Sequence, residues 1–332
     1  MAHVSAEDLQ KLIQDVFERC NTSTANAGSV SAALVAAELA GQTGHGLRRV
    51  ASYSAQALSG KVDGHAVPQA NRTAVASLKV DAANGFAYPA IDLVQANLPD
   101  MARECGIAIA GISRSHHCGV AGVVVEQLAQ QGLVAMLFAN TPGAMAPWGG
   151  NVALFGTNPI AFAAPVSGAG PIVVDVSLSK VARGKIMAAK QKGEPIPEGW
   201  ALGPDGEPTT DATTALSGTM VPLGDAKGTA LALMVELLAA SLNGANTADE
   251  ASSFFDADGP APGVGQTIIA IDPTKLGGDA VVSYFSAMAD KIDAQDGARV
   301  PGKRRQELRE KMLADGISVD DDLLQEIDRI GR

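Results

Sequence analysis

The sequence predicts an α/β fold, and three observations indicate it. Between about residue 74 and residue 271, apolar runs of strand length alternate with longer stretches in which apolar residues recur at helical spacing. The two ends of the chain, residues 5–59 and 303–332, read instead as helices. No Gly-x-Gly-x-x-Gly fingerprint follows any expected strand, so an ordinary dinucleotide-binding Rossmann domain is not indicated.

The N-terminal region is expected to form three helices. Ser5 can cap the first, over residues 5–20, because acidic residues follow in its first turn and apolar residues then recur on one face. An alanine-rich second helix is expected over residues 23–40. A third opens at the segment 44–50 and continues to about residue 59.

Strands and helices alternate in the middle of the chain. Residues 74–81 alternate like a half-buried strand, and Asn84-Gly85 is a turn signal. Further strands are expected at 107–112, 134–140, 160–164, 172–176 and 267–271. Helices are expected at 88–105, 120–131 and 228–242. Residues 193–218 are rich in Gly, Pro, Asp and Thr and are predicted to form a long surface excursion.

Composition excludes several classes of protein. The 332 residues include 46% hydrophobic and 18% charged side chains, which are ordinary values for an enzyme with a large core. The formal charge of −11 argues against general nucleic-acid binding, which requires neutralisation of phosphates. No apolar run reaches membrane-spanning length and no signal segment is visible, so no membrane association is expected. Three cysteines without a CxxC pattern favour a reducing, cytoplasmic location.

The stretch 111–122 holds two of the five histidines where an expected strand meets an expected helix. Ligands gather at such junctions, and histidine is the side chain best suited to proton transfer near neutral pH. Because adjacent residues of an extended chain point to opposite sides, one of His116 and His117 is expected to face inward and the other outward. The alternative is a buried histidine that only packs. Gly119 and Gly122 allow close backbone approach, and the next helix offers free N–H groups to a phosphate.

A second pair of residues that could take part in catalysis lies some seventy residues earlier. His45 and Arg49 are four residues apart, so a following helix would bring the two side chains together. A histidine that gives a proton and an arginine that grips a carboxylate suit an α-keto or α-imino acid. The alternative is a capped helix with a surface arginine.

Other candidates are weaker when taken singly. Asp175 ends an apolar strand, where an acid can contact a ribose hydroxyl or orient a histidine, or merely cap a helix. Lys227 stands at a helix N-terminus, where a positive charge is unfavourable unless an anion joins it. The basic run 299–305 could serve a cofactor phosphate or simply start a solvated helix. For Cys118 packing is favoured over thiol chemistry, and no zinc-like spacing of ligands indicates a metal.

Seven ordered motifs carry a resemblance over nearly the whole chain. They are His45–Arg49, Ser115–Gly119, Ala146–Gly150, Gly156–Pro159, Val181–Lys185, Gly193–Trp200 and Lys227-Gly228. With these motifs the sequence resembles the malate/L-lactate dehydrogenase family that lacks the Rossmann fold. That family also includes sulfolactate, ureidoglycolate and Δ1-piperideine-2-carboxylate/Δ1-pyrroline-2-carboxylate enzymes.

The resemblance implies a homodimer with a non-Rossmann nicotinamide-binding domain of mixed sheet, at 74–289, and a helical domain formed by 1–73 with 290–332. It implies that His117 exchanges a proton with the substrate, with His45 assisting and Arg49 binding the substrate. The implied cofactor contacts are His117, Cys118, Gly119, Val120, Ala121, Thr141, Thr157, Asp175, Val176, Ser177, Lys227, Arg304 and Arg305. NADP is favoured over NAD because additional arginines suit a 2′-phosphate.

The activity expected from the resemblance is an NAD(P)-dependent oxidoreductase. It would interconvert a small 2-hydroxy carboxylate of the malate, lactate or sulfolactate type with its 2-oxo acid. One alternative is an NADPH-dependent reductase of cyclic imino acids that yields L-proline or L-pipecolate. Gly44 stands where the family usually has serine, so the serine–histidine relay proposed for imines lacks its serine here. An alternative of another class is a small-anion binder without catalysis.

Overall fold

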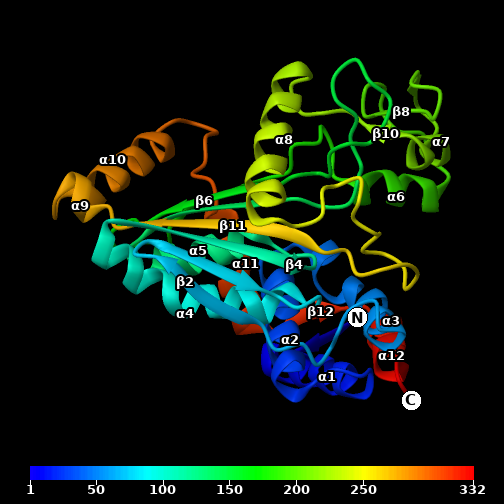
Figure 1. The fold of residues 1–332 in the computed structure, drawn as a ribbon, viewed down its shortest axis with the longest axis horizontal. Helices are drawn as coiled ribbons and strands as arrows, with labels where there is room; N and C mark the ends of the chain where they lie inside the picture. Colours follow the sequence, from blue (N-terminus) through cyan, green and yellow to red (C-terminus); the bar gives the residue numbers. More distant parts are fainter.

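The computed structural model describes residues 1–332 and is built around a seven-stranded sheet (Figure 1). The strand order is β2-β3-β4-β11-β5-β6-β7. Only β3 and β4 pair in parallel, and every other neighbouring pair is antiparallel, so the sheet is mixed. The strand bounds are β2 Gln69–Ala74, β3 Ser77–Asp81, β4 Ile107–Ser115, β5 Val134–Ala139, β6 Ile160–Ala164, β7 Ile172–Val176 and β11 Val264–Ile271.

Helices cover both faces of this sheet. Helix α4 (Ala87–Cys105) packs on β4, and α5 (Ala121–Gln130) packs on β5 and β6. Helix α8 (Ala226–Ala239) contacts β5 and β11 from the opposite side, as Figure 1 shows. The largest buried cluster lies between the sheet and the α4–α5 layer. This apolar layer fixes the C-terminal end of β4, where the paired histidines follow.

The two chain ends form a second packed region beside the sheet (Figure 1). Its helices are α1 Ala6–Arg19, α2 Thr24–Leu39, α3 Val50–Ser59, α11 Lys303–Asp315 and α12 Asp321–Arg329. Strand β1 (Ala2–Val4) pairs with β12 (Ile317–Val319) and ties the two ends together. The expectation that 303–332 is helical throughout is therefore wrong over β12, which is too short to show a strand pattern.

A third lobe surrounds α8. It contains α6 Arg183–Lys192, β8 Ala201–Leu202, β9 Pro208–Thr209, α7 Ala212–Ser217 and β10 Thr219–Met220. The strands form a small sheet, and Ile196, Ala201 and Ala215 are buried with α8 in one cluster. The predicted surface position of 193–218 is confirmed, since most of these residues are exposed, but the short strands and α7 within the segment were not expected. Strands of two residues carry no periodicity, and the turn residues between them masked the packed core.

The remaining elements are short, except one helix at the sheet edge. They are the 3-10 helices η1 Thr43–His45, η2 Leu47–Arg49 and η3 Ser241–Asn243, and the helices α9 Thr274–Gly277 and α10 Val281–Asp293. The expected strand at 74–81 is in fact a hairpin, with Ala74 ending β2 and Ser77 starting β3. Because β2 already belongs to the large sheet, residues 69–73 lie with the sheet. The division into two domains otherwise stays a prediction. No helix is both long and apolar enough to cross a membrane.

Candidate active site

Both histidines of the 111–122 stretch lie inside the protein. Strand β4 ends at Ser115, after Arg114 has adopted a positive φ of 50°, and the next residues have no regular structure. His116 is 1% exposed and His117 is 7% exposed. The expectation that one ring faces inward and the other outward is therefore wrong. Strand alternation does not apply beyond Ser115, and the rings lie between α3 and the segment around Phe254.

The structure brings His45 into direct contact with His117, which belongs to the stretch 111–122. His45 Nδ1 lies 3.1 Å from His117 Nε2, and one ring must donate a hydrogen bond to the other. The hydroxyl of Tyr53, on α3, contacts His117 Nδ1 and lies 3.4 Å from the hydroxyl of Tyr88. These four side chains form one buried polar chain, Tyr88–Tyr53–His117–His45. Tyr53 was not predicted from the sequence, although it lies four residues after Arg49, the same helical spacing that predicted Arg49 near His45.

The protonation of this chain follows from the partners. When the Tyr53 hydroxyl donates to His117 Nδ1, His117 carries its proton on Nε2 and donates to His45 Nδ1. His45 then keeps its own proton on Nε2. Burial, together with the positive charge of Arg49, lowers the pKa of His45 to about 4 and that of His117 well below its usual value. Burial raises the pKa of Tyr53 to about 12, so its hydroxyl remains a donor.

Arg49 stands beside this pair with part of its guanidinium group unpaired. Its Nε donates to the carbonyl oxygen of Gly44 at 2.8 Å, and its Cζ lies 4.5 Å from the centre of the Phe255 ring. Its Nη1 is buried without a hydrogen-bond partner. A buried, unpartnered guanidinium nitrogen is costly unless an anion meets it. The donor geometry of arginine fits a carboxylate.

His116 is held in a different way from His117. Its Nε2 lies 2.8 Å from Gln56 Oε1, and Gln56 Nε2 donates to the Phe254 carbonyl at 2.9 Å. Since that carbonyl can only accept, Gln56 Oε1 must be the acceptor from His116. His116 is therefore neutral with its proton on Nε2, and burial lowers its pKa to about 3. His116 thus contacts Gln56 and Phe254 and has no contact with His45.

The N-terminus of α5 adjoins the histidines and gathers several predicted cofactor contacts. The Gly122 N–H donates to Asp175 Oδ2 at 3.0 Å, and Arg305 Nη2 lies 3.2 Å from the same oxygen. Arg305 Nη1 is buried without a partner. Gly119 needs its positive φ of 68°, and a side chain there would collide with Tyr88. This helix N-terminus, with an unpaired guanidinium nitrogen beside it, suits a phosphate or a sugar hydroxyl.

Other predicted cofactor residues gather on the neighbouring strand ends. The Thr157 N–H donates to Thr141 Oγ1 at 2.9 Å, and the Leu178 N–H donates to the Thr157 carbonyl at 2.8 Å. The Leu223 N–H donates to the Leu178 carbonyl at 2.7 Å, which sets the start of α8 beside Ser177. Lys227, in the first turn of α8, is exposed and has no partner. Asp175, Val176 and Ser177 link this group to the α5 N-terminus.

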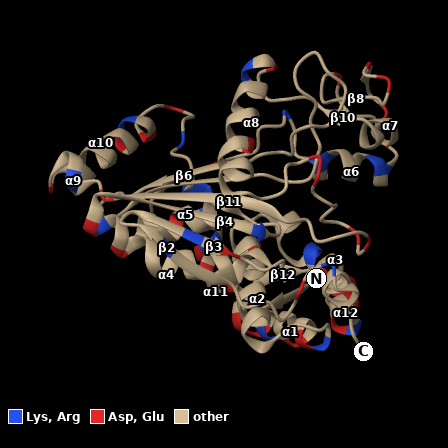
Figure 2. Ribbon diagram, viewed as in Figure 1, with Lys and Arg blue, Asp and Glu red and all other residues tan.

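The remaining predicted contacts differ in environment. Cys118, Val120 and Ala121 are buried, and burial raises the pKa of the Cys118 thiol to about 12, so the thiol packs rather than reacts. The basic run is not one patch, because Lys303 pairs with Asp293 at 2.7 Å and Arg304 is exposed. Figure 2 shows basic and acidic positions intermixed along the helices rather than one basic face. No group of three or more His, Cys, Asp or Glu side chains could hold a metal ion.

The structure thus places two hydrogen-bonded histidines beside an arginine whose Nη1 is buried without a partner. A family model described as malate/L-lactate dehydrogenase matches residues 4–328. The (2R)-3-sulfolactate dehydrogenase (NADP(+)) of Chromohalobacter salexigens is 48% identical over 306 residues, which are 92% of this chain and 91% of that protein. A Δ1-pyrroline-2-carboxylate/Δ1-piperideine-2-carboxylate reductase of Pseudomonas putida is 38% identical over 326 residues, 98% of this chain and 96% of that protein.

Solved structures agree with these relatives. The structure of Δ1-piperideine-2-carboxylate reductase from Pseudomonas syringae matches with a TM-score of 0.94 at 36% identity, over 99% of this chain and 100% of that one. Sulfolactate dehydrogenase from Methanocaldococcus jannaschii matches with a TM-score of 0.88 at 29% identity, over 98% and 96%. The chain belongs to the malate/L-lactate dehydrogenase family. The predicted family, the mixed α/β fold and the enzymatic nature of the protein are thereby confirmed.

Proposed function

We propose that this enzyme interconverts a small 2-hydroxy carboxylate, of the sulfolactate, malate or lactate type, with its 2-oxo acid, using NADP. The predicted class of activity and the predicted cofactor agree with the relatives, which include an NADP(+)-dependent sulfolactate dehydrogenase. One observation carries the proposal. The hydrogen-bonded pair of His45 and His117 lies beside Arg49, whose Nη1 is buried without a partner. A proton-transfer group and a carboxylate anchor thus share one site.

Each side chain has a distinct task in this mechanism. Arg49 binds the substrate carboxylate and so fixes the carbonyl carbon and oxygen relative to the histidines. The coupled pair His45–His117 delivers a proton to the substrate oxygen during reduction and accepts it during oxidation. Tyr53 holds His117 in one tautomer. The nicotinamide cofactor, when bound, supplies or accepts the hydride.

The residues fit the expected cofactor. The Ala121 N–H lies at the start of α5, and the unpaired Nη1 of Arg305 lies close to Gly122, whose own N–H is bonded to Asp175. We assign this end of α5, with Cys118 to Ala121 and Asp175 to Ser177, to cofactor binding. Thr141, Thr157 and Lys227 would complete it from the strand ends beside α8. Arg304 is exposed next to Arg305 and is the candidate for a 2′-phosphate.

A cyclic imino acid is the second candidate substrate. Reductases of Δ1-pyrroline-2-carboxylate and Δ1-piperideine-2-carboxylate at 34–38% identity support it. The same histidine pair would protonate an imine nitrogen or stabilise its protonated form. Gly44 lacks the hydroxyl of the serine that is usual at this position, and the relative of highest identity among those named here is a sulfolactate dehydrogenase. Both points favour the 2-oxo acid.

We also propose that the protein is a cytoplasmic homodimer. Three free thiols and no disulfide suit a reducing compartment. Helix α8 exposes Leu231, Leu233 and Leu237, and such apolar faces are the kind that subunit contacts cover.

A substrate panel tests the proposed function. Purified protein is mixed with NADPH and, separately, with 2-oxo acids including 3-sulfopyruvate, oxaloacetate and pyruvate, and with the two cyclic 2-imino acids. The fall in absorbance of the reduced cofactor is followed, with NADH in parallel. The proposal expects the highest kcat/KM with a 2-oxo acid and a preference for NADPH. A preference for an imino acid selects the second candidate. Cofactor binding without turnover of any compound would indicate a non-catalytic binder and overturn the proposal.

A further inference from the structure

The segment Ser252–Pro260 lies against the helix that carries Tyr53, although about two hundred residues separate them in sequence. In Figure 1 it is part of the yellow loop beside α3, between η3 and β11. It has no regular secondary structure. Three hydrogen bonds lie within it: Ser252 Oγ donates to the Pro260 carbonyl at 2.6 Å, the Phe255 N–H donates to Ser253 Oγ at 3.0 Å, and the Asp258 N–H donates to Asp256 Oδ1 at 3.3 Å. The segment is ordered by side chains rather than by a sheet or helix.

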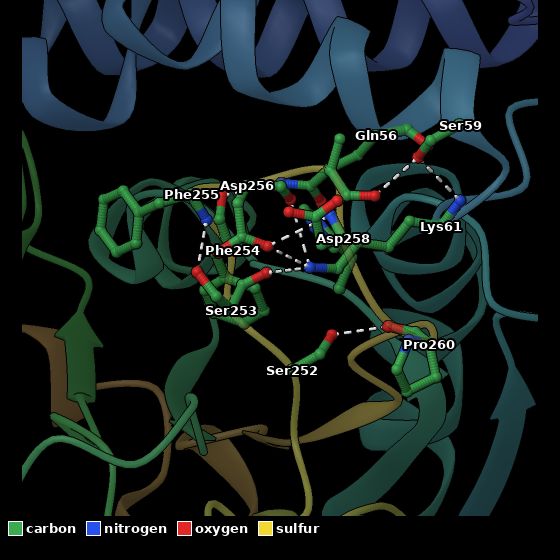
Figure 3. A network of polar contacts seen from close by, with 12 residues as sticks. Gln56, Ser59, Lys61, Ser252, Ser253, Phe254, Phe255, Asp256, Asp258 and Pro260 are labelled. Atoms are coloured by element: carbon green, nitrogen blue, oxygen red, sulfur yellow. Dashed lines mark hydrogen bonds and ion pairs between the residues drawn. The ribbon is translucent and has the colours of Figure 1, made fainter.

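Lys61, two residues beyond the end of α3, anchors this segment from inside. Its side chain is only 1% exposed, yet it carries an ammonium group. Its Nζ donates to the Ser253 carbonyl at 2.8 Å, to the Asp256 carbonyl at 3.2 Å and to Asp256 Oδ1 at 3.0 Å (Figure 3). All three ammonium protons are therefore used on one short segment. Burial of a charged lysine costs free energy unless the ammonium group is paired. A buried lysine that is paired only with this segment therefore indicates that the segment has a fixed position.

Two residues of α3 complete the attachment, as Figure 3 shows. Gln56 Nε2 donates to the Phe254 carbonyl, and Ser59 Oγ donates to the Ala257 carbonyl at 3.0 Å. The other end of the Gln56 amide accepts from His116. Gln56 thus joins the segment to the histidine stretch through both ends of its amide.

The two aromatic residues of the segment reach the site itself. The Phe254 ring lies 5.0 Å from His116 and 5.3 Å from His117, measured between ring centres. Phe255 places its ring against the guanidinium of Arg49 while remaining 47% exposed. Phe254 therefore keeps water from the histidines, and Phe255 backs the group proposed to hold the substrate carboxylate.

We propose that Lys61 and Gln56 are positioning residues, which fix the segment 252–260 so that Phe254 closes one side of the histidines and Phe255 orients Arg49 for the substrate carboxylate. The inference rests on the proposed function for its substrate. Phe255 acts directly on Arg49. Lys61 acts only through the segment, whereas Gln56 acts through the segment and through its hydrogen bond with His116. Loss of the anchor releases both phenylalanines together.

The test compares Lys61→Met, Gln56→Leu and Phe255→Leu with wild type and with Lys11→Met, a change of an exposed lysine on α1. Lys61→Met removes the ammonium but keeps an unbranched side chain of similar length. We expect KM for the best carboxylate substrate to rise about tenfold in Lys61→Met and Gln56→Leu, because Arg49 and the histidines lose their fixed placement. Phe255→Leu should raise KM about fivefold through loss of the contact with the guanidinium. The Kd for NADPH should not change.

Hydrogen exchange read without substrate separates this proposal from the proposed function. Amides of 252–260 should exchange faster in Lys61→Met than in wild type, while amides of α3 and β4 remain as protected as before. Because Phe255 lies at the surface, we expect the variant Phe255→Leu to retain the fold. Its KM can then be measured even if Lys61→Met is unstable. Unchanged exchange in 252–260, or faster exchange with an unchanged KM, would overturn the positioning role. An inactive wild type with the expected exchange pattern would instead overturn the substrate assignment.

Discussion

At the scale of single residues, the rings of His45 and His117 behave as one acid–base unit. Their facing nitrogens are 3.1 Å apart, so two positive charges on the pair would repel strongly. Burial already disfavours the first positive charge. The pair is neutral in the resting enzyme at neutral pH, and a proton enters it only when the solution is acidic enough or when an anionic substrate arrives.

This neutrality predicts a pH dependence. Reduction needs a protonated histidine pair, and above its pKa the protonated fraction falls about tenfold for each pH unit. With the pKa of His45 at about 4 and that of His117 also lowered, kcat/KM for reduction of a 2-oxo acid should fall steadily from pH 5 to pH 8. Steady-state rates with saturating NADPH check this. The carboxylate of the substrate stays ionised across the range, so a rate that is flat or that rises with pH would contradict it.

Arg304 carries the prediction on cofactor choice. Its side chain is exposed and lies next to Arg305, which is fixed by Asp175. Arg304→Ala should weaken NADPH binding about tenfold, the scale of one lost charge-assisted hydrogen bond, and leave NADH binding unchanged. Fluorescence titration with both cofactors measures this. An equal loss of affinity for NADPH and NADH, or no loss of affinity for either, would show that Arg304 does not contact a 2′-phosphate.

Among secondary-structure elements, α8 is tied to the strand ends by one buried carboxylate. Glu236 accepts hydrogen bonds from Asn140 at 3.1 Å, Asn158 at 2.8 Å and the Ala248 N–H at 2.8 Å. Burial raises its pKa, and the three donors compensate for that burial. Through the Ala248 N–H the carboxylate also holds the connection between α8 and β11, to which the segment 252–260 belongs.

Glu236→Leu should therefore lower the free energy of unfolding by about 3 kcal/mol or more, because buried donors lose their acceptor. Urea unfolding of the variant measures the change. Glu310→Leu, at an exposed position of α11, is the control and should change stability little. If Glu236→Leu lowers the free energy of unfolding no more than the control variant does, the buried donors have found other acceptors.

Most elements of ordinary length were predicted from the sequence, but the helices α6 and α10 and the short strands were not. The core strands and the helices α1, α4 and α5 follow apolar patterns that the sequence displays directly, whereas α2 and α8 were predicted from an alanine-rich and a continuously apolar run. Strands β1, β8, β9, β10 and β12 have two or three residues, and their pairing depends on partners far along the chain. Tyr53 and Lys61 were missed for the same reason, since their roles arise only when distant segments pack against α3.

The whole molecule consists of a mixed sheet, a helical region formed by the two chain ends and the lobe around α8. We expect it to act as a dimer. Sedimentation equilibrium should give twice the 33.8 kDa mass of one chain at micromolar concentration. A monomer under those conditions would contradict the proposed homodimer, and the exposed leucines of α8 would then need another explanation. The cluster of His45, Arg49 and His117 was predicted as the meeting of two regions, and the fold brings them together.

The central claim is that the coupled histidines move the proton for an NADP-dependent reaction on a small carboxylate. The most direct measurement is NADPH-dependent turnover of the best substrate by wild type and by His117→Ala. We expect kcat of His117→Ala to fall by about two orders of magnitude or more, with NADPH binding and thermal stability retained. Near-normal turnover by His117→Ala would contradict it.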